Sequence, residues 1–335
     1  MAVVTNTLQT TGVGAAGGNR EELSNIINRI TPEDTPIYSM IGKGTCSTTH
    51  PEWMIDTLRA PAANAQLEGD EFAFNATTQP VRVGNYTQIF RDSKIISETQ
   101  EAVDNAGNNQ KIAVQKAKMG IALRKDVELS IIANSASVAG ATRVSGGLPS
   151  WLTSNVSRGA GGANGGFNTG TGLTVAETTG TQRAMTKSLV DTLMGAVYGS
   201  GGKVGSMVVA PYVKSVFSTF MSDANVANQW VSVPSSGNRG MTLNGSVDAY
   251  ISPYGLIKVE MDRVMAGSAA LARRAYFIDP DTLSWLWLRP LAQVPDVAKT
   301  GDAEKLVMIG EGCLKVENEA GNGVIADIFG LSAAA

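Results

Sequence analysis

The chain has 335 residues, of which 43% are hydrophobic and only 17% charged, and its formal net charge is −3. A chain of this length can bury a sizeable core, and we expect two or three subdomains. The small negative charge gives no electrostatic case for nucleic-acid binding, because phosphate contacts depend on clustered Lys and Arg. The low charged fraction fits either extra surface buried against partners or a polar surface rich in Gly, Ser, Thr and Asn.

Targeting and redox signals are weak. Residues 1–18 contain no basic segment followed by an apolar one, so they do not form a secretory signal. No apolar run approaches the 18 or so residues that a membrane span requires. Cys46 and Cys313 show no framework spacing, which indicates two unpaired thiols in a reducing compartment such as the cytoplasm.

Residues 1–44 are expected to form an N-terminal arm and a short helix. The first 20 or so residues are rich in Thr, Gly, Ala and Asn and cannot bury enough apolar surface to fold alone. The next stretch, 20–30, places its apolar residues on one helical face: Leu23, Ile26, Ile27 and Ile30. Pro32 and Pro36 end this helix.

Residues 45–100 have a strand-like pattern that predicts an extended β-hairpin. Its central part, residues 67–79, is polar and rich in turn-forming residues, so we expect two extended arms joined by a flexible tip. A long hairpin far from any core is more stable when a neighbouring chain covers it.

Residues 101–140 contain the longest helical pattern, from Gln110 to Ala133. At about 1.5 Å per residue this helix is roughly 36 Å long. Apolar residues at spacings of seven and four form one face: Ile112, Met119, Leu123, Val127 and Ile131. The other faces are expected to carry the charged residues, Lys111, Lys116, Lys118, Arg124, Lys125, Asp126 and Glu128. No catalytic motif lies on it, which indicates a structural spine.

Residues 141–180 are dominated by glycine, and we interpret them as a surface loop or linker, with Trp151 and Phe167 as possible anchors. Residues 181–280 predict an α+β module. Its first helix places Met185, Leu189, Leu193 and Val197 on one face, and a helix beginning at Pro211 turns Val213, Phe217, Phe220 and Met221 inward. Residues 281–335 return to strand patterns, with a turn at 319–323.

The residue types needed for histidine-dependent chemistry are scarce. His50 is the single histidine, so a Ser-His-Asp, Cys-His or histidine-containing zinc site must use it. We interpret His50 as a surface or inter-subunit residue, and one histidine with two cysteines rarely makes a tetrahedral zinc site.

Other chemical motifs fail on their context. The GVGAAG stretch, with Gly12, Gly14 and Gly17, follows no strand, and GSGGKVG has Val204 after Gly202 and Lys203 where a P-loop needs Ser or Thr. Glu68, Asp70 and Glu71 could act as a glycosidase-like pair, but a mobile tip does not fix their separation. The sequence therefore predicts no catalytic, cofactor-binding or metal site, no cofactor, and a protein that is not an enzyme.

Several segments, taken in order, resemble a known family. They are TPEDTPIYSMIGKG, HPEWMIDTL, NYTQIFRDSKIISETQEAV and ALRKDVELSIIAN, followed by MVVAPYVKSVFSTF and LKVENEAGNGVIADI. Together they resemble the major capsid proteins of tailed bacteriophages with the HK97-type coat fold. The resemblance implies an α+β capsid fold. Residues 1–44 would be the N-terminal arm, 45–100 the extended loop over an adjacent subunit, 101–140 the spine helix of the peripheral domain, 141–180 an insertion, 181–280 the axial domain and 281–335 strands returning to the peripheral domain.

The resemblance also implies a function. We expect a major capsid protein that self-assembles through hexamers and pentamers into an icosahedral head around double-stranded DNA, with DNA contact that is not sequence-specific. Portal, scaffolding and decoration proteins are further candidate partners, no membrane is involved, and the protein would reside in the virion after assembly in the host bacterial cytoplasm. The alternatives are an encapsulin-like compartment that encloses cargo and, at greater distance, a carboxylate-based hydrolase.

Two expectations concern maturation. The family-like sequence begins near Arg20, so we expect no large N-terminal cleavage, with any scaffold encoded separately or absent. The stretch from Glu52 to Arg82 contains no lysine, and Lys94 lies at its base, so we expect shells held together without covalent Lys–Asn cross-links.

Overall fold

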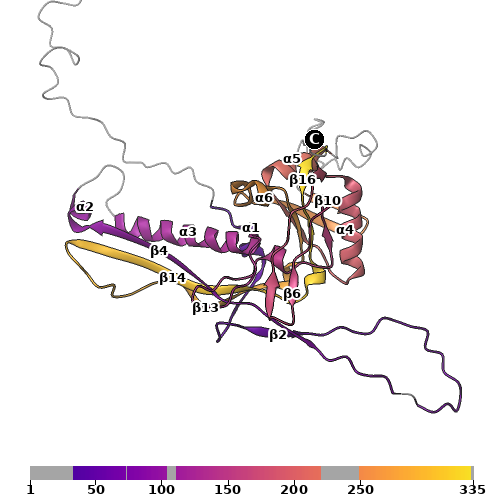
Figure 1. Ribbon diagram of the computed structural model, residues 1–335. Helices are drawn as coiled ribbons and strands as arrows, with labels where there is room; N and C mark the ends of the chain where they lie inside the picture. Colours follow the sequence, from indigo (N-terminus) through magenta and orange to yellow (C-terminus); the bar gives the residue numbers. More distant parts are fainter. Residues whose placement is uncertain (1–32, 73, 104–110, 220–248, 333–335) are drawn as a thin grey trace, which may run out of the picture.

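The computed structural model describes residues 33–72, 74–103, 111–219 and 249–332. Residues 1–32, which include most of the predicted arm and its predicted short helix, lie outside the described residues, as do the ends of two other predicted elements, including Phe220 and Met221. Figure 1 shows an elongated half built on a long helix, a more compact half above one end of it, and a thin loop projecting below.

The elongated half contains a four-stranded sheet in the order β1-β13-β14-β4. Its strands are β1 (Gly42–Thr45), β4 (Gln88–Ser97), β13 (Leu283–Gln293) and β14 (Ala303–Val316). β1 runs parallel to β13, and the other two pairs are antiparallel. Three helices accompany the sheet: α1 (Pro36–Met40), α2 (Glu98–Ala102) and α3 (Lys111–Ile132), which lies along β4 and β14 (Figure 1).

The long helix predicted from Gln110 to Ala133 is observed as α3. Met119, Leu123, Val127 and Ile131 are buried as the spacing predicts, and Ile112 is half-buried. One prediction on this helix is wrong: Glu128, expected on a charged outer face, is fully buried. It follows Val127 directly, so it faces α1 across the edge of the apolar stripe.

The predicted hairpin is much shorter than residues 45–100. Only β2 (Glu52–Ile55) and β3 (Val81–Gly84) pair with each other, with Glu52 opposite Gly84 and Ile55 opposite Val81. The strands on either side, β1 and β4, belong instead to the four-stranded sheet, because β13 and β14 supply their hydrogen-bonding partners. Residues 56–80, called here the projecting loop, contain no strand among their described residues (Figure 1).

The compact half contains a six-stranded sheet in the order β10-β11-β9-β12-β15-β5. Its strands are β5 (Val156–Ser157), β9 (Ser206–Val209), β10 (Ala249–Ser252), β11 (Gly255–Met261), β12 (Ala275–Ile278) and β15 (Gly323–Ile325). Two helices pack on it: α4 (Lys187–Gly199), with Thr186 accepting a hydrogen bond from the N–H of Leu189 at its start, and α5 (Pro211–Thr219). The short helices η5 (Met265–Gly267) and α6 (Ala269–Ala272) connect β11 to β12.

The central strands of this sheet are buried on both faces. Val208 of β9 and Tyr276 of β12 face the core that also contains α3, whereas Met207 and Phe277 face a second core beneath α4 and α5. This placement explains the continuous apolar runs of both strands, since a strand covered on both faces cannot alternate with polar residues. The first core joins the two halves.

The glycine-rich segment 141–180 is not the surface loop that its composition predicts. It forms η2 (Leu148–Ser150), β5, β6 (Gly166–Asn168) and β7 (Leu173–Val175), and it buries Leu148, Trp151 and Leu152. The two aromatics expected as anchors do contact the rest of the subunit, since Trp151 lies in the first core and Phe167 packs against that core.

The C-terminal strands divide between the two sheets. β13 and β14 lie in the elongated half beside α3, whereas β15 joins the six-stranded sheet and β16 (Ile328–Gly330) pairs with β8 (Arg183–Ala184). The expectation that residues 281–335 all return to the spine helix is therefore wrong for the last two strands. Between β14 and β15, η7 (Glu319–Gly321) replaces the predicted hairpin turn.

Candidate assembly surfaces

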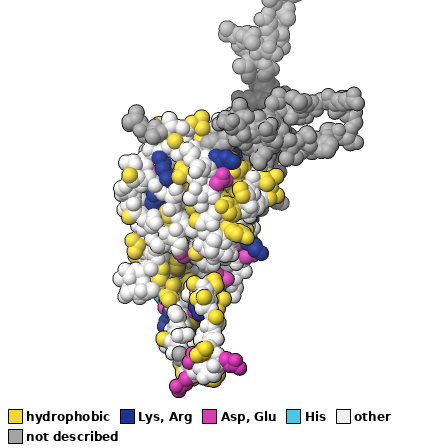
Figure 2. Space-filling view, turned by 90° about the vertical axis from the view of Figure 1, so that its right-hand side faces the viewer, with side chains coloured by type: hydrophobic (Ala, Val, Ile, Leu, Met, Phe, Trp, Pro, Cys, Tyr) yellow, Lys and Arg dark blue, Asp and Glu magenta, His cyan; other side chains and the backbone are white. Residues whose placement is uncertain are grey.

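The projecting loop exposes large apolar side chains. Leu58, Phe72 and Phe74 are 99%, 88% and 96% exposed, and Met54, Leu67 and Val81 are exposed beside them. Yellow and magenta side chains gather on this projection at the bottom of Figure 2. Several exposed large apolar side chains on one projection indicate an interaction site, because burying each such side chain contributes about 1.5–3 kcal/mol.

The tip of the projecting loop is acidic. A turn at Gly69, whose φ is +83°, brings Glu68, Asp70 and Glu71 together, and the N–H of Asp70 donates to the carbonyl of Leu67 at 3.2 Å. All three carboxylates are exposed, and among the described residues none has an ion-pair partner. An open turn of this kind lacks the enclosed geometry that a carboxylate pair needs for hydrolysis.

Asn85 fixes the root of the hairpin to the body of the protein. This fully buried side chain donates to the carbonyl of Leu314 at 2.7 Å and to that of Gly146 at 3.2 Å, and it accepts from the N–H of Gly146 at 2.8 Å. These bonds join the hairpin to β14 and to the glycine-rich segment.

Trp53, on β2, is the second anchor. Its indole Nε1–H donates to the carbonyl of Val316 at 2.9 Å, and its ring stacks on Trp151 with centroids 5.6 Å apart. Sequence reasoning missed both Trp53 and Asn85, although a tryptophan in an otherwise polar stretch was an available signal. The root of the projecting loop is thus bound to the subunit by a buried asparagine and a partly buried tryptophan.

The sole histidine is part of this root. The His50 ring stacks on Tyr86 with centroids 4.1 Å apart, and its Nδ1 lies 3.8 Å from Glu52 Oε1. Glu52 also pairs with Arg82 across the ladder, and the Arg82 hydrogen bond is the main cause of the lowered pKa of Glu52. His50 therefore lies in the hairpin root, and its interpretation as a surface or inter-subunit residue stays a prediction.

A half-exposed charge cluster joins three parts of the elongated half. The carboxylate of Glu311, on β14, accepts from Thr87 at 2.8 Å and pairs with Arg143 at 2.5 Å and Arg289 at 2.8 Å. Burial alone would raise the pKa of Glu311, but these hydrogen bonds outweigh it and hold the pKa below its ordinary value. Both carboxylate oxygens of Glu311 accept from partners within the subunit, so we interpret the cluster as structural.

A second cluster lies deep in the compact half. The side chain of Glu177 is fully buried and pairs with Arg158 and, at 2.5 Å, with Arg274, whose side chains are 5% and 3% exposed. Burial lowers the pKa of Arg158. This cluster ties the glycine-rich segment to β12, and the sequence offered no signal for it because its members are far apart along the chain.

The base of the N-terminal arm is attached to α3 by Glu128. Its two carboxylate oxygens accept from the backbone N–H groups of Ile37 at 2.8 Å and Tyr38 at 2.7 Å, at the start of α1. Burial raises the pKa of Glu128 to about 7, against the lowering effect of these two hydrogen bonds, and Asp262 raises it further. Glu128 thus fixes the start of α1 to the spine helix.

The remaining candidate residues do not form a reactive site. Cys46 is half-buried and Cys313 buried, both are free thiols, and burial raises the pKa of each. The N–H of Lys203, in the P-loop-like stretch, donates to Asp279 at 3.0 Å. The GVGAAG stretch lies outside the described residues.

The described residues contain neither a candidate metal site nor a candidate membrane span. In that part of the chain, no group of three or more His, Cys, Asp and Glu side chains could bind a metal ion. No helix there combines the length and the hydropathy of a transmembrane segment.

Sequence comparison gives two matches. The profile of the SU10 major capsid protein family matches residues 3–329, nearly the whole chain. The major capsid protein of Escherichia phage Phieco32 is 29% identical over 120 residues, which cover 36% of this chain and 34% of that one. The chain thus aligns with about a third of the length of this curated relative.

Structural comparison gives matches over nearly full length. The structure from Mycobacterium phage Bobi has a TM-score of 0.61 at 11% identity and covers 97% of this chain and 99% of its own. The capsid of a native GTA particle has a TM-score of 0.62 at 12% identity, and the match covers 96% of this chain and 99% of the GTA chain. The Cyanophage A-1(L) capsid gives 0.58 at 13% identity, with 95% and 98% covered.

At these identities the structural matches establish the fold, and the profile match establishes the family. The predicted α+β class and capsid fold are confirmed. The chain belongs to the SU10 major capsid protein family and has the HK97-type fold of phage coat proteins.

Proposed function

We propose that this chain is the shell-forming subunit of a bacteriophage head, a structural protein without catalytic activity. The main support for this proposal is the projecting loop of this HK97-type subunit. Its side chains Leu58, Phe72 and Phe74 are almost completely exposed, so the described residues of the same chain do not cover them. Such a surface is stable only when neighbouring subunits cover it.

The shell is proposed to form from copies of this chain arranged as hexamers and pentamers. Support for the pentamer comes from the similar GTA capsid, which was solved with C5 symmetry. In a closed shell, head-to-tail contacts of this kind must form rings, because a loop and its receiving surface differ. The glycine-rich segment and the α4–α5 module are proposed to act as the insertion and axial domain around these symmetry axes.

Double-stranded DNA is proposed as the content of the shell, contacted without sequence specificity. The net charge of −3 is compatible with enclosure and gives no basis for tight binding, because tight phosphate binding needs a basic surface. Portal, scaffolding and decoration proteins are proposed as further partners, with assembly in the host cytoplasm.

The family match and the similar capsids favour this function over the encapsulin-like compartment and the hydrolase. Electron microscopy of the purified full chain tests it, together with size-exclusion chromatography. We expect regular shells or capsomers that far exceed the 35.0 kDa monomer. A small closed oligomer under every assembly condition would contradict the proposal, and co-purifying cargo protein in place of DNA would support the compartment.

A further inference from the structure

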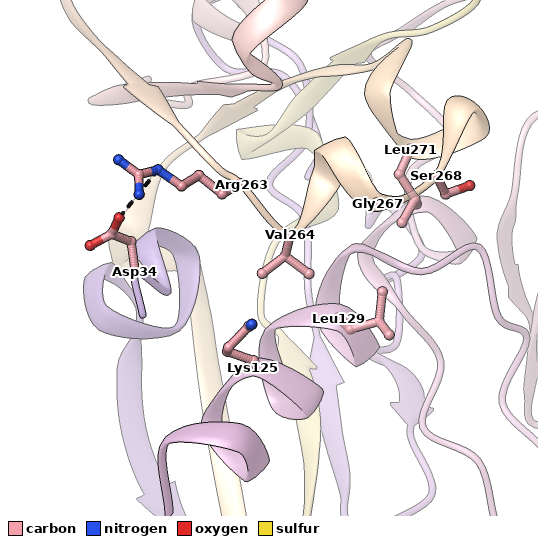
Figure 3. A pocket seen from close by; sticks show the side chains of 8 residues that line it. All are labelled: Asp34, Lys125, Leu129, Arg263, Val264, Gly267, Ser268 and Leu271. Atoms are coloured by element: carbon pink, nitrogen blue, oxygen red, sulfur yellow. Dashed lines mark ion pairs between the residues drawn. The ribbon is translucent and has the colours of Figure 1, made fainter. Parts of the chain in front are cut away.

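A cavity of about 430 Å³ opens where α3 meets the segment between β11 and β12. Figure 3 shows Lys125 and Leu129 on α3 facing Val264, Gly267, Ser268 and Leu271, with Asp34 and Arg263 at one side. The cavity therefore borders three regions: the base of the N-terminal arm, the spine helix and the compact half.

The cavity combines an apolar floor with a cationic rim. Leu129 of α3 is 43% exposed, and with Val264 and Leu271 it forms the floor. On the rim, Arg263 Nε lies 3.6 Å from Asp34 Oδ2, and both side chains are more than half exposed. Lys125 then leaves one surplus positive charge among the lining residues, so the cavity suits an amphipathic segment with a carboxylate beside its apolar face.

The chain itself contains such a segment immediately before the described residues. Residues 20–30 place Leu23, Ile26, Ile27 and Ile30 on one helical face. Glu22 flanks that face, since it lies one helical turn before Ile26. From Arg20 to Ile30 a helix is about 16 Å long.

The tether between this segment and the cavity is short. Ile30 lies four residues before Asp34, which lines the cavity, and four residues span at most about 14 Å. A short tether raises the effective concentration of the segment at the cavity to the millimolar range, about 1 mM or more. Pro32 and Pro36 prevent one continuous helix into α1, so the chain must turn between them.

We propose that residues 20–30 dock as an amphipathic helix in the cavity of their own subunit. Their apolar face covers Leu129, Val264 and Leu271, and Glu22 pairs with Lys125. Docking of this kind fixes the point on the spine helix from which residues 1–19 reach a neighbour. The docking itself needs no shell, whereas its role in guiding the arm rests on the proposed function.

Photo-crosslinking of the full chain tests the docking. Benzoylphenylalanine replaces Leu129 in one variant and the exposed Ser268 in a second, so that a folding defect in one leaves the other informative. We expect mass spectrometry to find crosslinks to residues 20–30 from both positions. Benzoylphenylalanine in place of Ile251, which is 60% exposed on β10, serves as the control and should give none.

Mixing isotopically heavy and light chains separates the possible occupants. Crosslinked peptides with a single isotope composition support docking within one subunit. Mixed-isotope peptides to residues 20–30, or to the acidic tip of another copy's projecting loop, overturn the proposal in favour of a second copy. Absence of crosslinks at both positions also overturns it, whether or not electron microscopy shows shells.

Two sets of substitutions test the chemistry. Ile26→Ser with Ile27→Ser should lower the crosslink yield about tenfold or more, since two apolar side chains lose their burial. Lys125→Glu should lower it about two- to fivefold, the range of an exposed ion pair, and adding Glu22→Lys should restore it. Unchanged yields in the isoleucine double variant would contradict the apolar docking, and absence of rescue would contradict the Glu22–Lys125 pairing.

Discussion

The projecting loop exposes its large apolar side chains, whereas the glycine-rich segment 141–180 buries several of its own. Leu58, Phe72 and Phe74 of the loop are almost completely exposed, whereas Leu148, Trp151 and Leu152 of the glycine-rich segment are at most 3% exposed. Neither region forms long strands. Length and regularity therefore do not decide which of them is stable within a single subunit.

The difference lies in partners within the same chain. The glycine-rich segment places Glu177 between two buried arginines, and its glycines allow close backbone contact, as at Gly159, which packs against the carbonyl of Thr181. The tip of the projecting loop carries three carboxylates that have no ion-pair partner among the described residues. A segment of the first kind completes the subunit, and we expect a segment of the second kind to be covered by neighbours.

The largest expected effect comes from removing the apolar side chains of the loop. In the triple variant Leu58→Ser, Phe72→Ser, Phe74→Ser, each contact forfeits about 1.5–3 kcal/mol, so shell formation should lose roughly 5–9 kcal/mol per loop. Electron microscopy should show no shells. The melting temperature of the unassembled chain should stay nearly unchanged, because exposed substitutions alter stability by about 0.5 kcal/mol or less.

A matched control keeps the loop's length and number of changes. Thr57→Ser, Thr77→Ser and Thr78→Ser together should leave both shells and stability intact. Normal shells from the apolar triple variant would show that the loop does not bind neighbours through these side chains.

Glu177→Ala should have the next largest effect, and it acts on the subunit itself. Removing the carboxylate leaves Arg158 and Arg274 buried without their partner, which should cost about 3–5 kcal/mol of unfolding free energy. Denaturant unfolding of the unassembled chain measures this loss. Glu71→Ala, at the exposed tip, is the control, and equal losses in the two variants would contradict the distinction between the regions.

Glu128 is a buried carboxylate that is bound by backbone N–H groups and, among the described residues, not by a cationic side chain. Its pKa is raised from the ordinary 4.5 to about 7, first by burial, so the folded state retains the proton longer than the unfolded state. Protonation of Glu128 therefore contributes its whole share of the unfolding free energy below pH 4.5. This share, about 3 kcal/mol in total, is lost as the pH rises to about 7. Glu128→Gln should remove this part of the pH dependence in denaturant unfolding, and Glu71→Gln should not; identical curves for all three proteins would contradict it.

Matched glycine substitutions should have a smaller effect. A Cβ on Gly159 would lie 1.8 Å from the carbonyl oxygen of Thr181, so Gly159→Ala should cost about 1–3 kcal/mol as the backbone shifts. Gly69, at the loop tip, has open space around its Cβ position and only its φ of +83° opposes alanine, at about 1 kcal/mol. Thermal unfolding of the two variants measures both losses of stability. A larger loss for Gly69→Ala than for Gly159→Ala would contradict the conclusion that Gly159 is the more closely packed glycine.

The local sequence pattern predicted an element correctly where neighbouring residues alone determine its structure. The apolar spacing of α3 predicted its bounds and four buried residues, and Pro211 marked the first residue of α5. The pattern failed where the partner is distant. Glu128 is buried because it binds Ile37, 91 residues earlier, and β4 leaves the hairpin because its partner β14 lies more than 200 residues later.

Composition gave a wrong prediction for the glycine-rich segment. Its glycines suggested a loop, but Arg274, nearly a hundred residues later, supplies the charge that buries Glu177. The assembly surface was partly predictable. The acidic cluster at the tip was identified, whereas Leu58, Phe72 and Phe74 follow no regular period that would have marked them as an exposed set.

The smallest expected effect concerns covalent bonds between subunits, which we predict to be absent. Isopeptide formation needs a lysine, an asparagine and a carboxylate in one dry pocket. The projecting loop carries Asn64 and Asn75 but no lysine, and Lys94 lies in β4 opposite Leu306, away from the loop tip. Boiling assembled particles in detergent should therefore release one band near 35.0 kDa. Lys94→Arg, which keeps the charge but removes the reactive amine, should give the same band.

The alternatives to this outcome separate by chemistry. A ladder of multimers that survives reducing agent would contradict non-covalent assembly, and its loss in Lys94→Arg would identify the amine. A ladder lost on reduction would instead indicate a disulfide, and Cys46 is the candidate because it is half-buried whereas Cys313 is fully buried. A single band would leave burial of the loop's apolar side chains as the force between subunits, with Glu68, Asp70 and Glu71 contributing register more than affinity.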